Sequence, residues 1–245
     1  MPWSKRTAIN SGEYMAQPNT PIILIPAYKP DDRLHALVTE LLAHFEVVVV
    51  DDGSGSAFTP IFDALPDRVV LLRHPANMGK GAALKTGINA IAHRFPNQAV
   101  ITADSDGQHT TNDILKLAQA MQAQPEALVL GCRQFTKDIP LRSRFGNLMT
   151  KALFRPIVGF RVSDTQTGLR GLPAAHLQAL AQLPGNRYEY EFNMLLWTKI
   201  THVPIVEIPI QTIYIDNNSS SHFHVIRDSS RIYRCLLRFA FRHRV

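Results

Sequence analysis

Residues Ala99–His109 read AVITADSDGQH, and the fold and the function are both predicted from this stretch. Its apolar first half is typical of a short buried strand. Asp104 and Asp106 follow where that strand should end, and Gln108 continues the alternation. Alternate residues of an extended chain share one face, so three oxygen-bearing side chains would point into one crevice. Such oxygens favour Mg²⁺ or Mn²⁺, although paired Asp residues also suit the start of a helix.

Buried runs with polar ends occur twice earlier in the chain. Pro21–Ala27 is continuously apolar, and Glu46–Asp52 is an apolar run that closes with two carboxylates. Helical spacing over Asp31–His44 separates the two runs, and a short helix near Phe58–Leu65 and a strand at Arg68–Leu72 follow. This alternation predicts an α/β domain with a doubly wound, mostly parallel sheet. Ligands bind such sheets at the carboxyl ends of the strands, where these polar residues fall.

The segment Asn77–Ala83 (NMGKGAA) precedes a predicted helix that runs to about Arg94. Small residues allow a ligand to approach the backbone, and a helix N-terminus attracts anions. Lys80 would add a point charge for a diphosphate, although an ordinary glycine-containing turn explains the segment equally well. The remaining predicted elements are a helix at Thr111–Ala123, a strand at Ala127–Gly131, a loop or turn at Ser163–Gly171, a helix that begins near Tyr188, and edge strands at Val203–Ile208 and Gln211–Ile215.

The composition narrows the class of protein. The 245-residue chain is 45% hydrophobic, which suits one large or two small globular domains. Cys132 and Cys235 are too few for a disulfide framework, so we expect a reducing compartment. No apolar run approaches the ~20 residues of a membrane span, and the N-terminus lacks the apolar core of a signal peptide. We therefore expect a cytoplasmic protein.

The net charge of +6 is concentrated near the C-terminus, where the residues from His222 onward include six Arg and one Asp. A local basic segment argues against a nucleic-acid-binding protein with a broad positive face, and it indicates an anionic partner. Five arginines at three- and four-residue steps form one helical stripe: Arg227, Arg231, Arg234, Arg238 and Arg242. Such a helix suits an anionic membrane surface. The alternatives are a helix packed on the domain with its arginines in water, and docking on a membrane protein subunit.

Taken together, six motifs in order resemble family 2 of the glycosyltransferases. They are residues 26–28 (PAY), 50–54 (VDDGS), 77–81 (NMGKG), 104–108 (DSDGQ), 164–170 (DTQTGLR) and 189–191 (EYE). The nearest branch is that of the dolichyl- or undecaprenyl-phosphate sugar transferases, of the dolichyl-phosphate mannose synthase type. The resemblance implies a GT-A fold over residues 21–215. Residues 1–20 would be an N-terminal tail, and residues 216–245 a linker with a membrane- or partner-associated helix.

The resemblance also implies roles for single residues. The nucleotide sugar would contact Pro26, Ala27, Tyr28, Asp52, Lys80, Asp104 and Ser105. Asp104, Asp106 and Gln108 would hold Mg²⁺ or Mn²⁺ on the donor diphosphate. Arg133 and, more weakly, Ser143 and Arg144 are candidates for the acceptor phosphate, and Arg170 for the donor diphosphate. The catalytic roles in this interpretation fall to Asp104, Asp106, Arg170 and Glu189.

The implied reaction is an inverting, metal-dependent transfer of a hexose from a nucleotide sugar of the GDP-mannose or UDP-glucose type to a polyprenyl phosphate. It would take place on the inner face of the cell membrane. The metal and a cation such as Lys80 or Arg170 would offset the charge that collects on the leaving diphosphate. A phosphate acceptor is already ionised near pH 7 and needs no general base. A saccharide hydroxyl, the alternative acceptor, would need Glu189 or Glu191 as its base. A nucleotide-sugar-binding regulator without catalysis is the non-enzymatic alternative.

Overall fold

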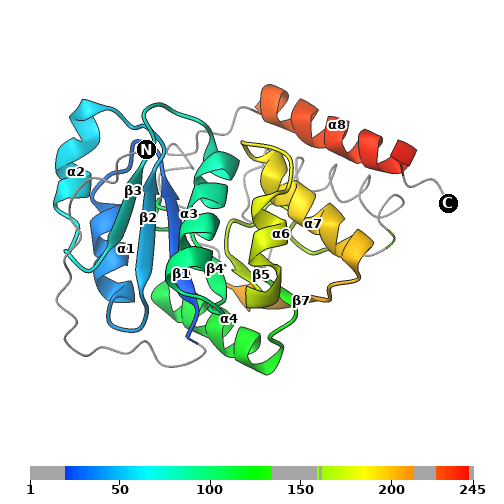
Figure 1. The fold of residues 1–245 in the computed structure, drawn as a ribbon, viewed down its shortest axis with the longest axis horizontal. Coiled ribbons are helices and arrows are strands. Elements are labelled where there is room, and N and C mark those ends of the chain that lie inside the picture. Colours follow the sequence, from blue (N-terminus) through cyan, green and yellow to red (C-terminus); the bar gives the residue numbers. More distant parts are fainter. Residues whose placement is uncertain (1–19, 134–158, 160–161, 212–224, 243–245) are drawn as a thin grey trace.

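A computed structural model describes residues 20–133, 159, 162–211 and 225–242 of the chain. Within them, a seven-stranded sheet has the order β3-β2-β1-β4-β6-β5-β7 (Figure 1). The strands are β1 (Ile22–Ala27), β2 (Val47–Asp51), β3 (Val70–Arg73), β4 (Val100–Thr102), β5 (Leu128–Arg133), β6 (Arg170–Leu172) and β7 (Ile205–Ile210). Only β6 runs antiparallel to its neighbours in this sheet. The predicted α/β class with a mostly parallel sheet is therefore confirmed.

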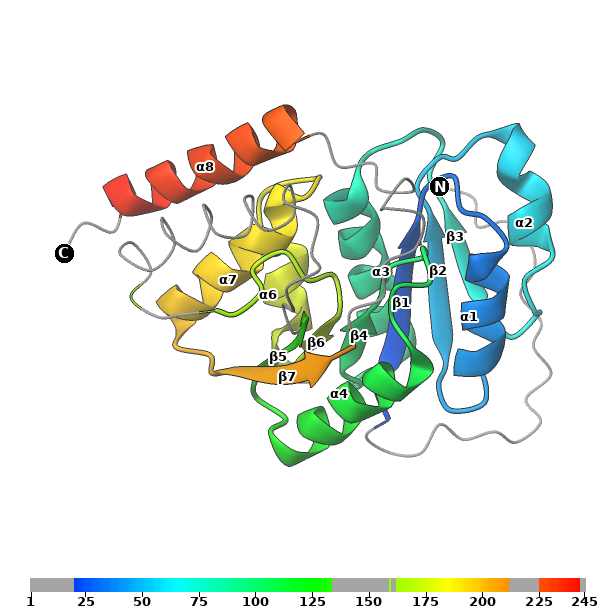
Figure 2. The ribbon, with the colours of Figure 1, turned by 180° about the vertical axis from the view of Figure 1, so that it is seen from behind.

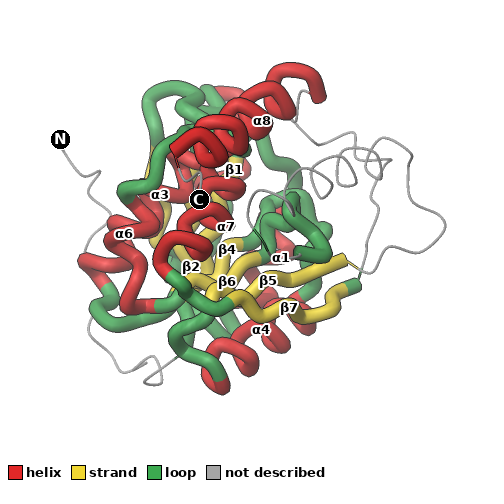
Figure 3. Tube along the Cα trace, turned by 90° about the vertical axis from the view of Figure 1, so that its right-hand side faces the viewer, coloured by secondary structure: helices red, strands yellow, loops and turns green. Residues whose placement is uncertain are grey.

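Helices cover both faces of the sheet (Figure 2). On one face lie α1 (Arg33–Leu41), α2 (Thr59–Asp63) and α4 (Thr111–Ala123), and on the other α3 (Lys80–Arg94), α6 (Leu177–Ala181) and α7 (Glu189–Thr201). Short 3-10 turns at Ser56–Phe58 and Ala174–His176 precede α2 and α6. The last helix, α8 (Val225–Arg242), runs along the outer side of α7 (Figure 3). The described part of the chain contains no helix with both the length and the apolar character needed to cross a membrane.

The central strand β1 explains why the sheet needs two helical layers. Its side chains alternate, so that Ile22 and Leu24 join the core under α3 while Ile23 and Ile25 join the core under α1 and α4. A strand that is buried on both faces reads as the continuous apolar run seen in the sequence. Helix α3 packs closely on β1 at Gly87, where any larger residue would clash: a Cβ atom there would lie 2.1 Å from Leu24 Cδ1.

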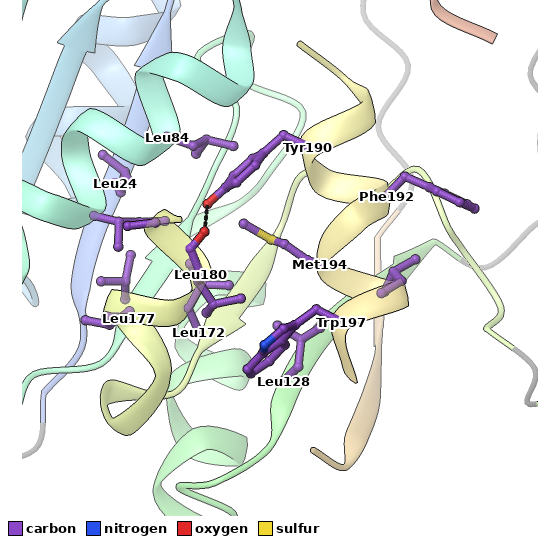
Figure 4. Packing of buried hydrophobic residues seen from close by; sticks show 14 of the residues in the cluster. Leu24, Leu84, Leu128, Leu172, Leu177, Leu180, Tyr190, Phe192, Met194 and Trp197 are labelled. Carbon is purple, nitrogen blue, oxygen red and sulfur yellow. Dashed lines mark hydrogen bonds between the residues drawn. The ribbon is translucent and has the colours of Figure 1, made fainter. Parts of the chain in front are cut away.

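A buried hydrogen bond links α7 to α6 within the core. The phenol of Tyr190 is buried, and its hydroxyl donates a hydrogen bond of 2.9 Å to the Leu180 carbonyl (Figure 4). Met194 and Trp197 follow on the same helix and pack among the leucines of α6 and the sheet. This contact fixes α6 against the first turn of α7, the turn that also carries Glu191.

Several predicted elements match the structure closely. The helix predicted to follow the Asn77–Ala83 segment ends at Arg94 as expected but begins inside the segment, at Lys80, and β7 with its Pro209 is an edge strand. The segment Ser163–Gly171 ends in the three-residue strand β6, which is too short to show a sequence period. The predicted strand at Gln211–Ile215 lies almost wholly outside the described residues, as do Ser143 and Arg144.

Candidate active site

A cleft of about 460 Å³ opens at the carboxyl ends of β1, β2 and β4. Parallel pairing brings these three strand ends to one edge of the sheet, which is the usual ligand-binding edge of such folds. The residues that line the cleft are Pro26, Ala27, Tyr28, Lys29, Pro30, Asp31, Arg33, Asp52, Asn77, Gly79, Lys80, Asp104, Ser105, Asp106, Arg187 and Tyr188. This list includes every residue that the resemblance assigns to the nucleotide sugar except Arg170, the candidate for the donor diphosphate.

An ion cluster lies at the inner end of the cleft. Lys80, the first residue of α3, places its Nζ 2.7 Å from Asp104 Oδ1 and 3.0 Å from Glu191 Oε1. Asp104 follows β4, whereas Glu191 comes from the first turn of α7. His109 Nε2 lies 3.5 Å from the other oxygen of Asp104. Three segments that are far apart in the sequence therefore meet at one ammonium group.

The ionisation states in this cluster follow from burial and charge. Burial works to lower the pKa of Lys80, but the carboxylates of Asp104 and Glu191 outweigh it and the pKa is raised. Burial works to raise the pKa of Asp104, but Lys80 and His109 outweigh it and the pKa is lowered. Lys80 is thus an ammonium ion and Asp104 a carboxylate. The pKa of Asp106 is raised by burial and by the neighbouring charge of Asp104.

The carboxylates of Asp104 and Asp106 fit a divalent ion whose remaining ligands come from the substrate. Among the residues that the structure describes, no group of three or more His, Cys, Asp or Glu could hold a metal by itself. Asp104 and Asp106 do offer two oxygen ligands to the cleft, and Mg²⁺ commonly binds through one or two carboxylates plus substrate phosphates. Gln108 does not line the cleft, and its backbone N–H donates to Asp106 Oδ1 at 3.0 Å.

Asp52 lines the cleft, but its carboxylate accepts hydrogen bonds from groups of the protein itself. Its two oxygens accept hydrogen bonds of 2.8–2.9 Å from His74 Nδ1, Asn77 Nδ2 and the backbone N–H groups of Met78 and Gly79. A carboxylate offers about four acceptor positions, so these four donors fill it. Asp52 therefore fixes the loop that leads into α3 and sets the position of Lys80.

Arg170 and Arg133 are not brought to the cleft. The guanidinium of Arg170 is fully buried, and it donates to the backbone carbonyls of Thr165, Thr167 and Glu191. This places it within the core as a tie between a loop and α7, away from the predicted diphosphate position. Arg133 pairs with the buried Asp164, with Nε 2.6 Å from Oδ2. Its side chain keeps 25% exposure, so it lies at the surface near the end of β5.

Glu189 also lies outside the cleft lining. Its Oε1 accepts hydrogen bonds from the backbone N–H groups of Asn186 and Arg187, at 3.1 and 3.3 Å. The carboxylate thus orders the turn before α7. Glu191, which is 6% exposed, is the carboxylate of this helix that reaches the ion cluster.

Sequence reasoning missed several residues that line the cleft. Arg33 and Arg187 add positive charge to its wall, and Lys29 follows Tyr28. The side chain of Asp31 orients Arg33, with Arg33 Nε 2.9 Å from Asp31 Oδ1. A signal was present for Arg33, because it follows the predicted strand end within a few residues. No signal was present for Arg187, which only the packing of α7 brings to the site.

The cleft lies at the edge where α/β enzymes of this sheet topology bind their ligands, and both carboxylates and cations line it. Residues 22–176 match the pattern of the family described as Glycosyl transferase family 2. The chain belongs to this family and is a glycosyltransferase with a GT-A fold.

Similar proteins span most of the chain. A UDP-N-acetylglucosamine--dolichyl-phosphate N-acetylglucosaminyltransferase from Methanococcus voltae is 29% identical over 237 residues, which cover 88% of this chain and 94% of that protein. A polyprenol monophosphomannose synthase from Mycolicibacterium smegmatis is 25% identical over 203 residues, which cover 77% of this chain and 76% of that protein.

Among solved structures, glucosyl-3-phosphoglycerate synthase from Mycobacterium tuberculosis, in complex with Mn²⁺, uridine-diphosphate-glucose and phosphoglyceric acid, superimposes with a TM-score of 0.65 at 17% identity. The superposition covers 91% of this chain and 80% of that one. At this level of identity the likeness shows the fold alone.

Proposed function

We propose that this protein transfers a hexose-type sugar, with inversion, from a nucleotide sugar of the GDP-mannose or UDP-glucose type to a polyprenyl phosphate. The observation that carries the proposal is the cleft itself. It gathers two carboxylates, Lys80 and two arginines around one space at the carboxyl edge of the sheet. The relatives from Methanococcus voltae and Mycolicibacterium smegmatis support the acceptor, because their names specify dolichyl phosphate and polyprenol.

The donor diphosphate would lie between the carboxylates and the cations of the cleft. Asp104 and Asp106 would hold a divalent ion, which would supply charge neutralisation for the departing diphosphate. Lys80, Arg33 and Arg187 would supply further positive charge from the protein. The segment from Pro26 to Tyr28 would form the wall beside the base.

The positions of Glu189 and Glu191, the two candidate bases, support a phosphate as the acceptor. A hydroxyl needs a general base within hydrogen-bond reach, whereas a phosphate is already ionised. Glu191 is engaged by Lys80, and Glu189 is engaged by two backbone N–H groups outside the cleft lining. We therefore expect Glu189→Gln to retain substantial turnover. A saccharide hydroxyl in cell-surface polysaccharide synthesis is the second candidate, and abolished turnover in Glu189→Gln would favour it.

Helix α8 supports a position on an anionic membrane at its cytoplasmic face. Its inner side is used for packing, since Ile232, Leu236 and Phe239 are buried in the core. Its outer side exposes Leu237 at 55% and Phe241 at 67%, with the exposed residues Arg234 and Arg238 beside them. Apolar side chains flanked by arginines suit the headgroup region, where each Arg contributes about 1 kcal/mol.

Vesicle co-sedimentation tests this position. We expect the protein to bind vesicles that contain phosphatidylglycerol and to bind neutral phosphatidylcholine vesicles far less. The double variant Leu237→Glu and Phe241→Glu should lose most of the binding while its thermal unfolding stays unchanged, because both side chains face solvent. Equal binding by this variant would contradict the membrane role of α8.

The transfer itself is tested by a donor panel. The protein is incubated with Mn²⁺ or Mg²⁺, undecaprenyl phosphate and labelled nucleotide sugars one at a time, and label is counted in the organic phase. We expect label from one donor and none when the acceptor is undecaprenol, which lacks the phosphate. Donor binding without transfer to either acceptor would instead support the alternative of a nucleotide-sugar-binding regulator without catalysis.

A further inference from the structure

The backbone at Lys80 is held in place, whereas its ammonium group lies at the end of a flexible side chain. The backbone N–H of Gly79, the residue before it, is held by the carboxylate of Asp52 at 2.8 Å. The side chain of Lys80 keeps 17% exposure and lines the cleft. Four methylene groups let the ammonium reach different partners from one fixed Cα position. A lysine anchored in this way can change its anionic partner without any movement of the backbone.

The carboxylate of Asp104 is 30% exposed to the cleft, but groups of the protein already approach both of its oxygens. A Cβ atom on Gly168 would lie 2.2 Å from Asp104 Oδ2, so the backbone of Gly168 closes that side. His109 Nε2 also faces Oδ2, at 3.5 Å, and Oδ1 carries the ammonium of Lys80 at 2.7 Å. A divalent ion that binds Asp104 must share this carboxylate with the lysine or displace it, and two cations on one carboxylate repel each other.

The balance of charge changes when a nucleotide sugar enters. The ammonium of Lys80 is shared between two carboxylates, those of Asp104 and Glu191, and Asp106 lines the same cleft. A diphosphate and a divalent ion arrive together as a pair of opposite charges. The ion can then take the Asp104 oxygen while the diphosphate offers the lysine a new partner.

We propose that Lys80 is a placeholder cation, which neutralises Asp104 in the nucleotide-free protein and moves to the diphosphate when the donor and the metal bind. This inference rests on the proposed function. It has two consequences. The free protein binds a divalent ion weakly, and the return of Lys80 to Asp104 after the reaction favours release of the nucleoside diphosphate and the metal. Glu191 keeps the ammonium near the cleft in both arrangements.

Mn²⁺ binding to the nucleotide-free protein, measured by electron paramagnetic resonance, tests the proposal without any turnover. Lys80→Gln keeps a hydrogen-bond donor for the carboxylates but removes the charge. We expect it to bind Mn²⁺ about tenfold more tightly than the unaltered protein, because the competing cation is gone. Lys80→Arg, which keeps the charge, should show no such gain. UDP or GDP should raise the Mn²⁺ affinity of the unaltered protein more than that of Lys80→Gln.

The matched control is Lys85→Gln, on the same helix. Lys85 Nζ contacts Asn186 Oδ1 at 2.7 Å outside the cleft lining, and the variant changes the net charge by the same amount. Mn²⁺ affinity in Lys80→Gln that equals or falls below that of the unaltered protein would overturn the placeholder role. An equal gain in Lys85→Gln would overturn it too, as a mere effect of net charge.

Two further measurements keep the test decisive. Circular dichroism establishes that Lys80→Gln is folded, and Lys80→Met serves in its place if it is not. The transfer assay is run separately on the unaltered protein. Transfer without the Mn²⁺ gain would overturn the placeholder role and leave the proposed function intact. The Mn²⁺ gain without transfer to any acceptor would support the placeholder role and count against the proposed function.

Discussion

Replacing Asp52 by Asn should destabilise the protein as well as weaken donor binding. The side chain of Asp52 is 3% exposed, and each oxygen accepts one backbone N–H and one side-chain donor. Asparagine has one carbonyl oxygen and one NH₂ group. Whichever way the amide turns, its NH₂ group faces the backbone N–H of either Met78 or Gly79. One buried donor is then left without an acceptor.

The magnitude follows from these contacts. A buried unsatisfied donor costs about 1–3 kcal/mol, and the remaining hydrogen bonds lose the strength that an ionised acceptor gives them. We expect the free energy of unfolding of Asp52→Asn to fall by about 3 kcal/mol. The loop from Asn77 to Gly79 would also shift, so that Lys80 no longer points correctly at Asp104. The affinity for the nucleotide sugar should therefore fall in the same variant.

Urea denaturation followed by circular dichroism measures the loss of stability. The control is Asp63→Asn, because Asp63 is 53% exposed and pairs with Arg73 at 2.7 Å on the surface. Such a surface pair contributes about 0–1 kcal/mol, so this variant should unfold almost as the unaltered protein does. If Asp52→Asn unfolded like the control and lost only donor affinity, Asp52 would be a direct nucleotide ligand and the positioning argument would be refuted.

Three other variants test single contacts. Gly168→Ala places a Cβ atom 2.2 Å from Asp104 Oδ2 and displaces this carboxylate, so kcat should fall about 100-fold or more while the fold persists. A near-normal kcat would contradict the close approach. Arg133→Met removes the cation paired with the buried carboxylate of Asp164, so the free energy of unfolding measured in urea should fall by about 3–5 kcal/mol. A fall below about 1 kcal/mol would show that stability does not depend on the pair. Leu236→Ala should cost about 2–5 kcal/mol, because Leu236 is 2% exposed; unchanged stability would mean that α8 does not dock on α7.

The sequence predicted the parts of this fold that depend on local pattern. Continuous apolar runs located β1 and β2, and the small residues around Gly79 located the start of α3. The carboxylates at strand ends could be placed together because parallel strands finish at one edge. The part of the cleft lining that comes from the ends of β1, β2 and β4 therefore follows from the sheet topology, which the order of strands and helices determines.

The contacts that depend on packing between distant segments could not be predicted. Arg170 stands in a polar, glycine-containing segment and carries a charge, which is the pattern of a phosphate ligand. Its partners are instead three backbone carbonyls: those of Thr165 and Thr167 lie in the same segment, and that of Glu191 is brought by α7. Arg187 enters the cleft for the same reason. The hydrogen bonds of Asp52 could not be predicted either, because their four donors lie 22–27 residues further along the chain.

Mass spectrometry of the lipid fraction tests the central claim most directly. The unaltered protein and Asp106→Asn are incubated with the preferred nucleotide sugar, a divalent ion and undecaprenyl phosphate, with and without EDTA. We expect a glycosyl phosphoryl undecaprenol from the unaltered protein, none in EDTA, and at most a trace from Asp106→Asn. Equal product from Asp106→Asn, or undiminished product in EDTA, would contradict a metal-assisted transfer at this cleft.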